Sequence, residues 1–181
     1  KRDHFIYASS PDRGLLELLR AWPRIREKLP DATLSIFYGW KGCTRLGGMQ
    51  LPDWTKRFQE IRREYETLRW QPGVQDIGMV DHVRLAQEFM RAGVWGYFTK
   101  FDETGCCNAV KARAGGAIPV CTPRAALVET AACEQGFFVP ENDEDSFVSA
   151  CVAATQVDDA ARKAMSEEAI ATYGLPAILP S

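Results

Sequence analysis

The feature that most constrains the fold is a regular alternation between short apolar runs and amphipathic stretches along the chain. The short runs have the length and residue types of strands, and they cover residues 4–9, 32–38, 74–79, 94–98, 117–121 and 136–139. Strands that alternate with helices are typical of a parallel sheet, because each parallel connection needs a long crossover. The sequence therefore predicts an α/β fold, a Rossmann-like parallel sheet of about six strands with helices on both faces.

The amphipathic stretches carry apolar residues at the spacing of one helix face. They predict helices over residues 15–28, 54–70, 83–92, 106–114, 125–133, 144–154 and 158–173. Asp53 and Asp81 are predicted N-caps of the second and third of these helices. Trp54 and Trp70 are predicted to pack the second helix against the core.

Length and composition exclude several classes of protein. A chain of 181 residues suits a single domain, residues 1–181, and its charged start reads as a domain cut from a longer chain. The net charge of −2 argues against a nucleic acid partner. No apolar run is long enough to predict a membrane span.

The six cysteines contain no CxxC pair, and His4 and His82 lie far apart, so a metal site is not expected. A chain of this size needs no disulfides for its core. We therefore expect free thiols and a cytoplasmic location.

Ligands bind to parallel α/β sheets at the carboxyl ends of the strands, so the loops after the strands are the candidate sites. In loop 9–14, Arg13 lies just before a predicted helix, whose free backbone N–H groups favour an anion. The alternative is that Arg13 is a surface residue and Gly14 a turn. The loop lacks the GxGxxG pattern, so a nicotinamide or flavin cofactor is not indicated.

Loop 99–105 places Asp102 and Glu103 before a helix that starts with small residues. Small residues let a ligand approach the backbone N–H groups, and a carboxylate there can accept hydrogen bonds from sugar hydroxyls. The alternative is that both carboxylates only complement the helix dipole. Two weaker candidates are Trp40, which could stack on a base, and His82, which we interpret as a solvated first-turn residue rather than a general base.

The segment 101–120 resembles the donor-site motif of the large retaining GT-B glycosyltransferase family, which includes sucrose synthase-like and lipopolysaccharide mannosyltransferase-like enzymes. That motif has a glutamate, seven residues, a second glutamate, then alanine, small residues, glycine and a Pro-Val strand. Segments 10–15, 37–39 and 127–129 are similar to other parts of the family pattern. The resemblance covers nearly the whole chain, from residue 4 to about residue 155.

The resemblance implies that this chain is the C-terminal lobe, which binds a nucleoside diphosphate sugar, and that the N-terminal acceptor-binding lobe is the missing partner. It implies that Arg13 holds the diphosphate and that Glu103 contacts the donor sugar as the catalytic residue. It implies no metal and no cofactor, because basic groups and helix N-termini neutralise the leaving diphosphate. The remaining residues implied in donor binding are Gly39, Thr104, Gly105, Cys106, Cys107 and Lys111.

Two positions depart from the family pattern. Lys111 replaces the second glutamate, which holds ribose hydroxyls in the family, and lysine cannot accept a hydrogen bond. Ala8 replaces an arginine of the phosphate clamp. The leading hypothesis is the donor-binding lobe of a glycosyltransferase. The alternatives are a non-catalytic lobe that binds or scaffolds within a multidomain protein, and a related epimerase or phosphorylase lobe.

Overall fold

The computed structural model describes residues 1–40 and 52–174 of the chain. In order, the described elements are β1 (His4–Tyr7), α1 (Leu15–Lys28), β2 (Thr33–Phe37), α3 (Pro52–Leu68), β3 (Val74–Gly78), α4 (His82–Arg91), β4 (Val94–Tyr97), α5 (Cys107–Ala114), β5 (Ile118–Cys121), α6 (Leu127–Thr130), β6 (Phe137–Phe138), α7 (Glu144–Gln156) and α8 (Asp159–Tyr173). Strands and helices alternate as the sequence predicts. No helix in this described part is both long and apolar enough to cross a membrane.

Among the described residues, six strands form one parallel sheet in the order β3-β2-β1-β4-β5-β6. The central strand β1 pairs with both β2 and β4, so that Phe5 lies opposite Leu34 on one side and Val94 on the other. The strand order reverses between β1 and β4. In open parallel sheets a ligand crevice forms at such a reversal, outside the carboxyl ends of the two strands.

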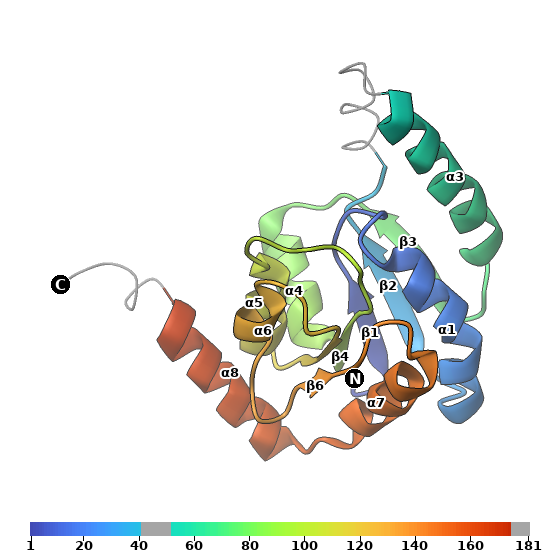
Figure 1. Cartoon of the computed structure of the whole chain (residues 1–181). Helices are drawn as coiled ribbons and strands as arrows, with labels where there is room; N and C mark the ends of the chain where they lie inside the picture. Colours follow the sequence, from blue (N-terminus) through green and yellow to red (C-terminus); the bar gives the residue numbers. More distant parts are fainter. Residues whose placement is uncertain (41–51, 175–181) are drawn as a thin grey trace.

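Helices cover both faces of the sheet, which confirms the predicted fold class (Figure 1). On one face α1 packs against α3 and α7, and on the other face α5 packs against α4, α6 and α8. The carboxyl ends of the central strands point toward the top of Figure 1. Loops that enter α1 and α5 therefore leave the sheet at the same edge.

Helix α1 shows how the sequence pattern becomes packing. All six apolar residues that predicted it are buried, namely Leu15, Leu16, Leu18, Leu19, Trp22 and Ile25. Pro23 lies inside the helix and lacks an N–H, so the Leu19 carbonyl loses its helical donor. The Gln71 side-chain amide donates to that carbonyl at 2.9 Å, which satisfies the buried acceptor from outside the helix.

The core is rich in aromatic side chains. Phe5 packs edge-on against Trp22 at a centroid distance of 5.3 Å, and the indole N–H of Trp22 donates to the Pro72 carbonyl at 3.0 Å. On β4, Trp95 stacks on Tyr97 at 4.9 Å with an interplanar angle of 16°. These rings are fully buried, so they fix the strands that carry the candidate site.

Three predictions about helices are wrong. The helix expected over 125–133 is only α6, because Ala125 has a left-handed φ of 42° and Leu127 is its one buried residue. Asp53 lies inside α3 rather than capping it, since the helix begins at Pro52, whose fixed φ suits a first turn. Trp70 lies beyond α3 and is 75% exposed, so it does not pack that helix.

Two further helix starts compare closely with the sequence. The Asp81 carboxylate accepts from the Arg84 N–H at 2.7 Å and caps α4, as predicted. Cys106 is the N-cap of α5 rather than its first residue. Most of the loop expected between Gly39 and Pro52, together with Cys43 and the tail 176–181, falls outside the described residues.

Candidate functional site

The candidate site lies at the carboxyl ends of β1 and β4, where the strand order reverses. The loop after β1 and the loop after β4 approach each other closely at Gly14, whose φ is +96°. A Cβ atom at this position would lie 2.5 Å from the Phe98 carbonyl oxygen. Only glycine fits both the backbone conformation and the contact, so Gly14 allows the two candidate loops to meet.

Arg13 and Glu103, which the sequence separates by ninety residues, are brought into contact here. The Arg13 Nη1 atom lies 3.3 Å from each carboxylate oxygen of Glu103. Glu103 is buried at 6% exposure, whereas the Arg13 side chain is 35% exposed. The pair therefore exposes more of its cation than of its carboxylate.

The surroundings of Arg13 fix its charge and its orientation. Its guanidinium lies 4.1 Å from the centre of the Phe101 ring, within the range of a cation–π contact. Burial disfavours the charge, but the Glu103 carboxylate and neighbouring groups outweigh it and raise the pKa of Arg13. The Arg13 Nε atom is buried and has no hydrogen-bond partner among the described residues. Arg13 is thus a charged side chain with unused donor capacity, and not a freely solvated surface residue.

Tyr97 is a further member of this cluster that the sequence did not identify. The Tyr97 hydroxyl donates to Glu103 Oε1 at 2.5 Å and lies 3.3 Å from the Ser9 hydroxyl. Ser9 belongs to the predicted loop 9–14, but Tyr97 reads only as a strand residue. Its position at the carboxyl end of a predicted strand was the one signal that could have found it.

The start of α5 completes the site. Asn108 donates its side-chain amide to the Ala8 carbonyl and so ties the first turn of α5 to the end of β1. Thr104, Gly105 and Cys107 are exposed, and a Cβ atom at Gly105 would meet nothing within 4 Å. Cys106 is buried, and burial raises the pKa of its thiol to about 11. The three exposed residues leave space beside the first turn of α5, and a role of this turn in donor binding stays a prediction.

Three predicted residues lie outside the cluster. Lys111 is half-buried on α5, and it has no ion pair within the described residues 1–40 and 52–174. Gly39 follows β2 with a φ of +69°, next to the end of β3. Trp40 packs against Tyr65 of α3 at 5.2 Å. This contact occupies part of the ring that was considered for base stacking.

Asp102 differs from the adjacent Glu103 in both its exposure and its partner. It is exposed and binds Arg124 at 2.7 Å, and Arg124 also binds Glu141. Asp102 therefore belongs to a surface ion-pair network that joins the loops after β4, β5 and β6. His82 is exposed in the first turn of α4, as predicted.

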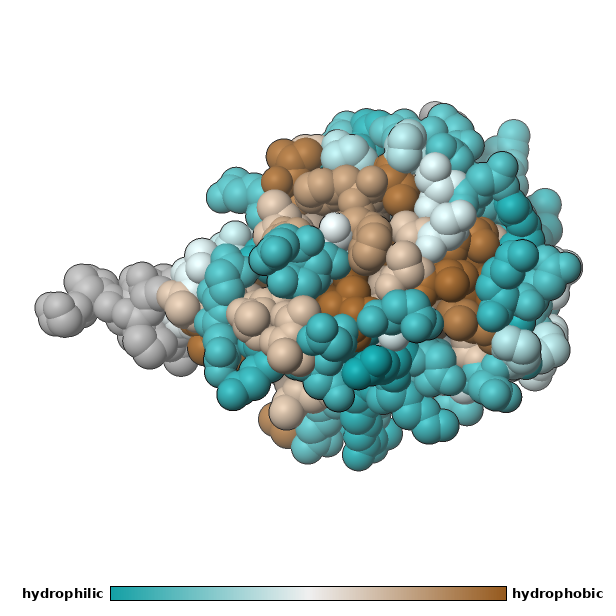
Figure 2. Space-filling model, turned by 90° about the horizontal axis from the view of Figure 1, so that it is seen from below, coloured by the Kyte–Doolittle hydropathy of each residue, from teal (hydrophilic) through white to brown (hydrophobic). Residues whose placement is uncertain are grey.

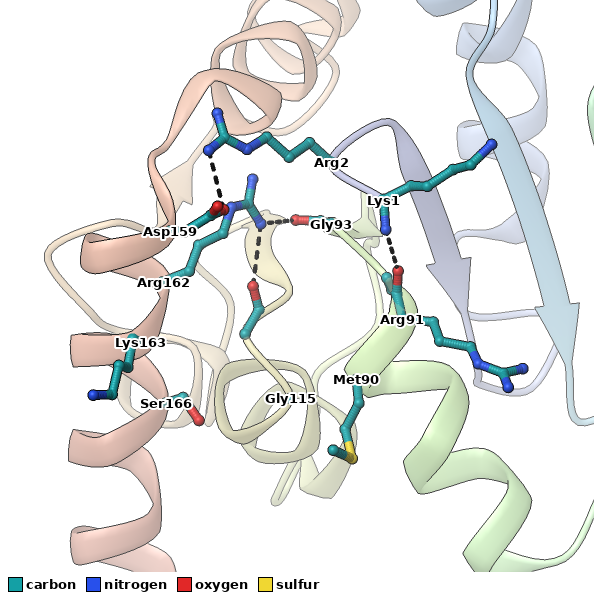
Figure 3. Close-up of a pocket in the computed structure, with 12 residues that line it drawn as sticks. Lys1, Arg2, Met90, Arg91, Gly93, Gly115, Asp159, Arg162, Lys163 and Ser166 are labelled. Atoms are coloured by element: carbon teal, nitrogen blue, oxygen red, sulfur yellow. Dashed lines mark hydrogen bonds and ion pairs between the residues drawn. The ribbon is translucent and has the colours of Figure 1, made fainter.

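The opposite edge of the sheet, where the strands begin, has a separate cavity of about 490 Å³. Figure 2 shows this face, on which hydrophobic residues gather near the middle and hydrophilic residues surround them. The buried Arg162 donates to the Gly93 and Gly116 carbonyls. Figure 3 shows the contact of Arg162 with Gly93 and the ion pair between Arg2 and Asp159. These cations satisfy protein groups, and none of the predicted donor-site residues lines this cavity.

The described part of the chain contains no group of three or more His, Cys, Asp or Glu side chains that could hold a metal ion. The described cysteines are free thiols: Cys106, Cys107, Cys121, Cys133 and Cys151. The chemistry that the candidate site offers consists of the partly exposed cation of Arg13, the buried carboxylate of Glu103 and the N-terminus of α5. Such a set suits an anion joined to a group with hydroxyls.

No protein-family model matches the sequence, and a search of curated proteins finds no match. Solved structures, by contrast, match nearly the whole chain. The chain is similar to the crystal structure of a GtfA/B complex, with a TM-score of 0.71 and 16% identity, over 98% of this chain and 34% of that one.

It is also similar to a UDP-forming α,α-trehalose-phosphate synthase from Burkholderia xenovorans, with a TM-score of 0.71 and 16% identity, over 96% of this chain and 41% of that one. A third similar structure is Anabaena Alr3699/HepE in complex with UDP and glucose, with a TM-score of 0.62 and 17% identity, over 92% of this chain and 42% of that one. The chain thus spans less than half the length of each of these proteins. At these identities the likeness shows the fold.

Proposed function

We propose that this chain, which has the fold of one lobe of a retaining GT-B glycosyltransferase, is the donor-binding lobe of such an enzyme. The enzyme transfers a sugar from a nucleoside diphosphate sugar to an acceptor. The observation that carries the proposal is the meeting of Arg13 and Glu103 at the reversal of strand order. Each of the two residues also lies in a segment that resembles a donor-binding segment of the family.

In this proposal each group has one task. Arg13 and the N-terminus of α5 bind the diphosphate and stabilise the charge that develops on it as the bond to the sugar breaks. Glu103 accepts hydrogen bonds from sugar hydroxyls. The exposed backbone at Thr104, Gly105 and Cys107 lets the sugar and phosphate approach. The acceptor is bound by a second lobe, and the reaction requires both lobes.

A second candidate, a non-catalytic GT-B lobe, is favoured by two residues. Lys111 and Ala8 replace an acceptor and a donor of the family pattern. Lys111 forms no ion pair within the described residues that would give it a structural task instead. A lobe of this kind would retain the fold and bind nucleotides weakly or not at all.

Calorimetric titration of this chain with UDP, UDP-glucose, ADP-glucose and GDP-mannose tests the proposal. We expect binding of at least one nucleotide, and we expect Arg13→Gln to weaken it about tenfold or more, since a charge-assisted bond to phosphate is lost. Arg24→Gln is the matched control, because Arg24 pairs with Glu144 at 3.0 Å on the surface between α1 and α7. Absence of binding throughout the panel would favour the non-catalytic lobe.

A further inference from the structure

We propose that Tyr97 is a positioning residue that holds the Glu103 carboxylate in place for the donor sugar. The inference rests on the proposed function, because it assigns Glu103 to the sugar rather than to the nucleotide. Tyr97 itself does not contact the ligand in this proposal. It acts through one hydrogen bond to one oxygen of Glu103.

The Tyr97 hydroxyl is placed to donate rather than to accept at Glu103. An ionised carboxylate has no proton to give, so the phenol supplies the proton of the 2.5 Å contact with Oε1. Its single proton is then used, and the Ser9 hydroxyl must donate to Tyr97 across their 3.3 Å contact. Burial and the bond to Glu103 raise the pKa of Tyr97, so the phenol keeps its proton at any physiological pH.

The Tyr97 ring is held too firmly to follow a moving carboxylate. It is fully buried, stacks on Trp95 at 4.9 Å and packs against Tyr7 at 6.0 Å. Close-packed rings of this kind stay in one rotamer. The Tyr97 hydroxyl therefore has a fixed position at the carboxyl end of β4, and its hydrogen bond holds Glu103 beside it.

The two oxygens of Glu103 differ as a result. Oε1 accepts from Tyr97 and lies 3.3 Å from Arg13 Nη1, whereas Oε2 contacts only Arg13 among the described residues. Each carboxylate oxygen can accept two hydrogen bonds, so Oε2 has a free position. Tyr97 thereby selects Oε2 as the atom that receives a sugar hydroxyl.

The test compares UDP with UDP-glucose as probes for Tyr97→Phe, which removes the hydroxyl and keeps the buried ring. We expect UDP-glucose to bind about two- to tenfold more weakly and UDP to bind as before, since only the sugar contact loses its fixed carboxylate. Tyr65→Phe is the matched control. Tyr65 is equally buried and donates to Asp76 at 2.5 Å, but it lies on α3 away from the cluster.

A merely structural role for Tyr97 predicts another result, namely equal loss of UDP and UDP-glucose binding in Tyr97→Phe. The effect of Tyr97→Phe should also disappear in a Glu103→Gln background. If it persists there, Tyr97 does not act through Glu103 and the proposal is wrong.

A structural readout separates this inference from the proposed function. In crystal structures of the unliganded chain, Glu103 should leave its position in Tyr97→Phe and keep it in Tyr65→Phe. An unmoved Glu103 overturns the positioning role even if nucleotides bind. Failure of the wild type to bind any nucleotide overturns the proposed function, while the position of Glu103 still decides the role of Tyr97.

Discussion

Reversing the charge of Lys111 tests how far the candidate donor site departs from the family pattern. Lys111 is four residues beyond Cys107, the first residue of α5, which places it about 6 Å along the helix axis. Helical side chains lean toward the N-terminus, so a residue here can reach back toward the site. A glutamate would restore an acceptor for ribose hydroxyls, which lysine lacks.

The expected effects on affinity and on stability have opposite signs. A charge-assisted hydrogen bond contributes about 1.5–3 kcal/mol, so Lys111→Glu should tighten nucleotide binding roughly ten- to a hundredfold. Lys111 also lies in the last turn of α5, where a cation is favourable and an anion is not. Without ligand, the free energy of unfolding should therefore fall by about 0.3–1 kcal/mol.

The assay is calorimetric titration of both proteins with the same nucleotides, together with chemical denaturation of both without ligand. Lys28→Glu is the matched control, because Lys28 lies in the last turn of α1, away from the carboxyl ends of the strands. It should lose similar stability and leave affinity unchanged. Weaker binding by Lys111→Glu, with an unchanged Lys28→Glu, would mean that Lys111 itself contacts the ligand, and our interpretation of this position would be refuted.

Two further predictions concern stability. Gly14→Ala should lower the free energy of unfolding by about 1–3 kcal/mol or more in chemical denaturation, because it forces a left-handed backbone on alanine and a contact with the Phe98 carbonyl. Gly105→Ala is the control and should have little effect, since a Cβ atom there meets nothing within 4 Å. Equal losses in the two variants would contradict the close approach at Gly14. Burial lowers the pKa of His4 from 6.5, so the unfolded chain binds the proton first, and stability should fall as pH drops from about 6.5 toward the lower pKa of the folded state. His4→Gln should show a shallower pH dependence over that range, and an unchanged dependence would exclude His4 as its source.

The sequence predicted those parts of the fold that depend on local pattern. The spacing of apolar residues predicted both ends of α1 as the structure has them. The short apolar runs predicted the ends of all the described strands to within a few residues. Asp81 was identified as a cap because a cap acts within one turn of its own helix. The helix expected over 125–133 is shortened to α6, because Ala125 adopts a left-handed φ of 42° that the apolar pattern does not reveal.

The same distinction holds for the candidate site. The sequence alone predicted Arg13 and Glu103 as candidates, since both belong to loops that follow strands. Only the tertiary structure decided that Arg13, Glu103 and Tyr97 meet, because their contact depends on β1 lying beside β4. Strand order is fixed by packing between residues far apart in the chain, and no local period encodes it. For the same reason, only the folded chain shows that Gln71 satisfies the carbonyl that Pro23 leaves open in α1.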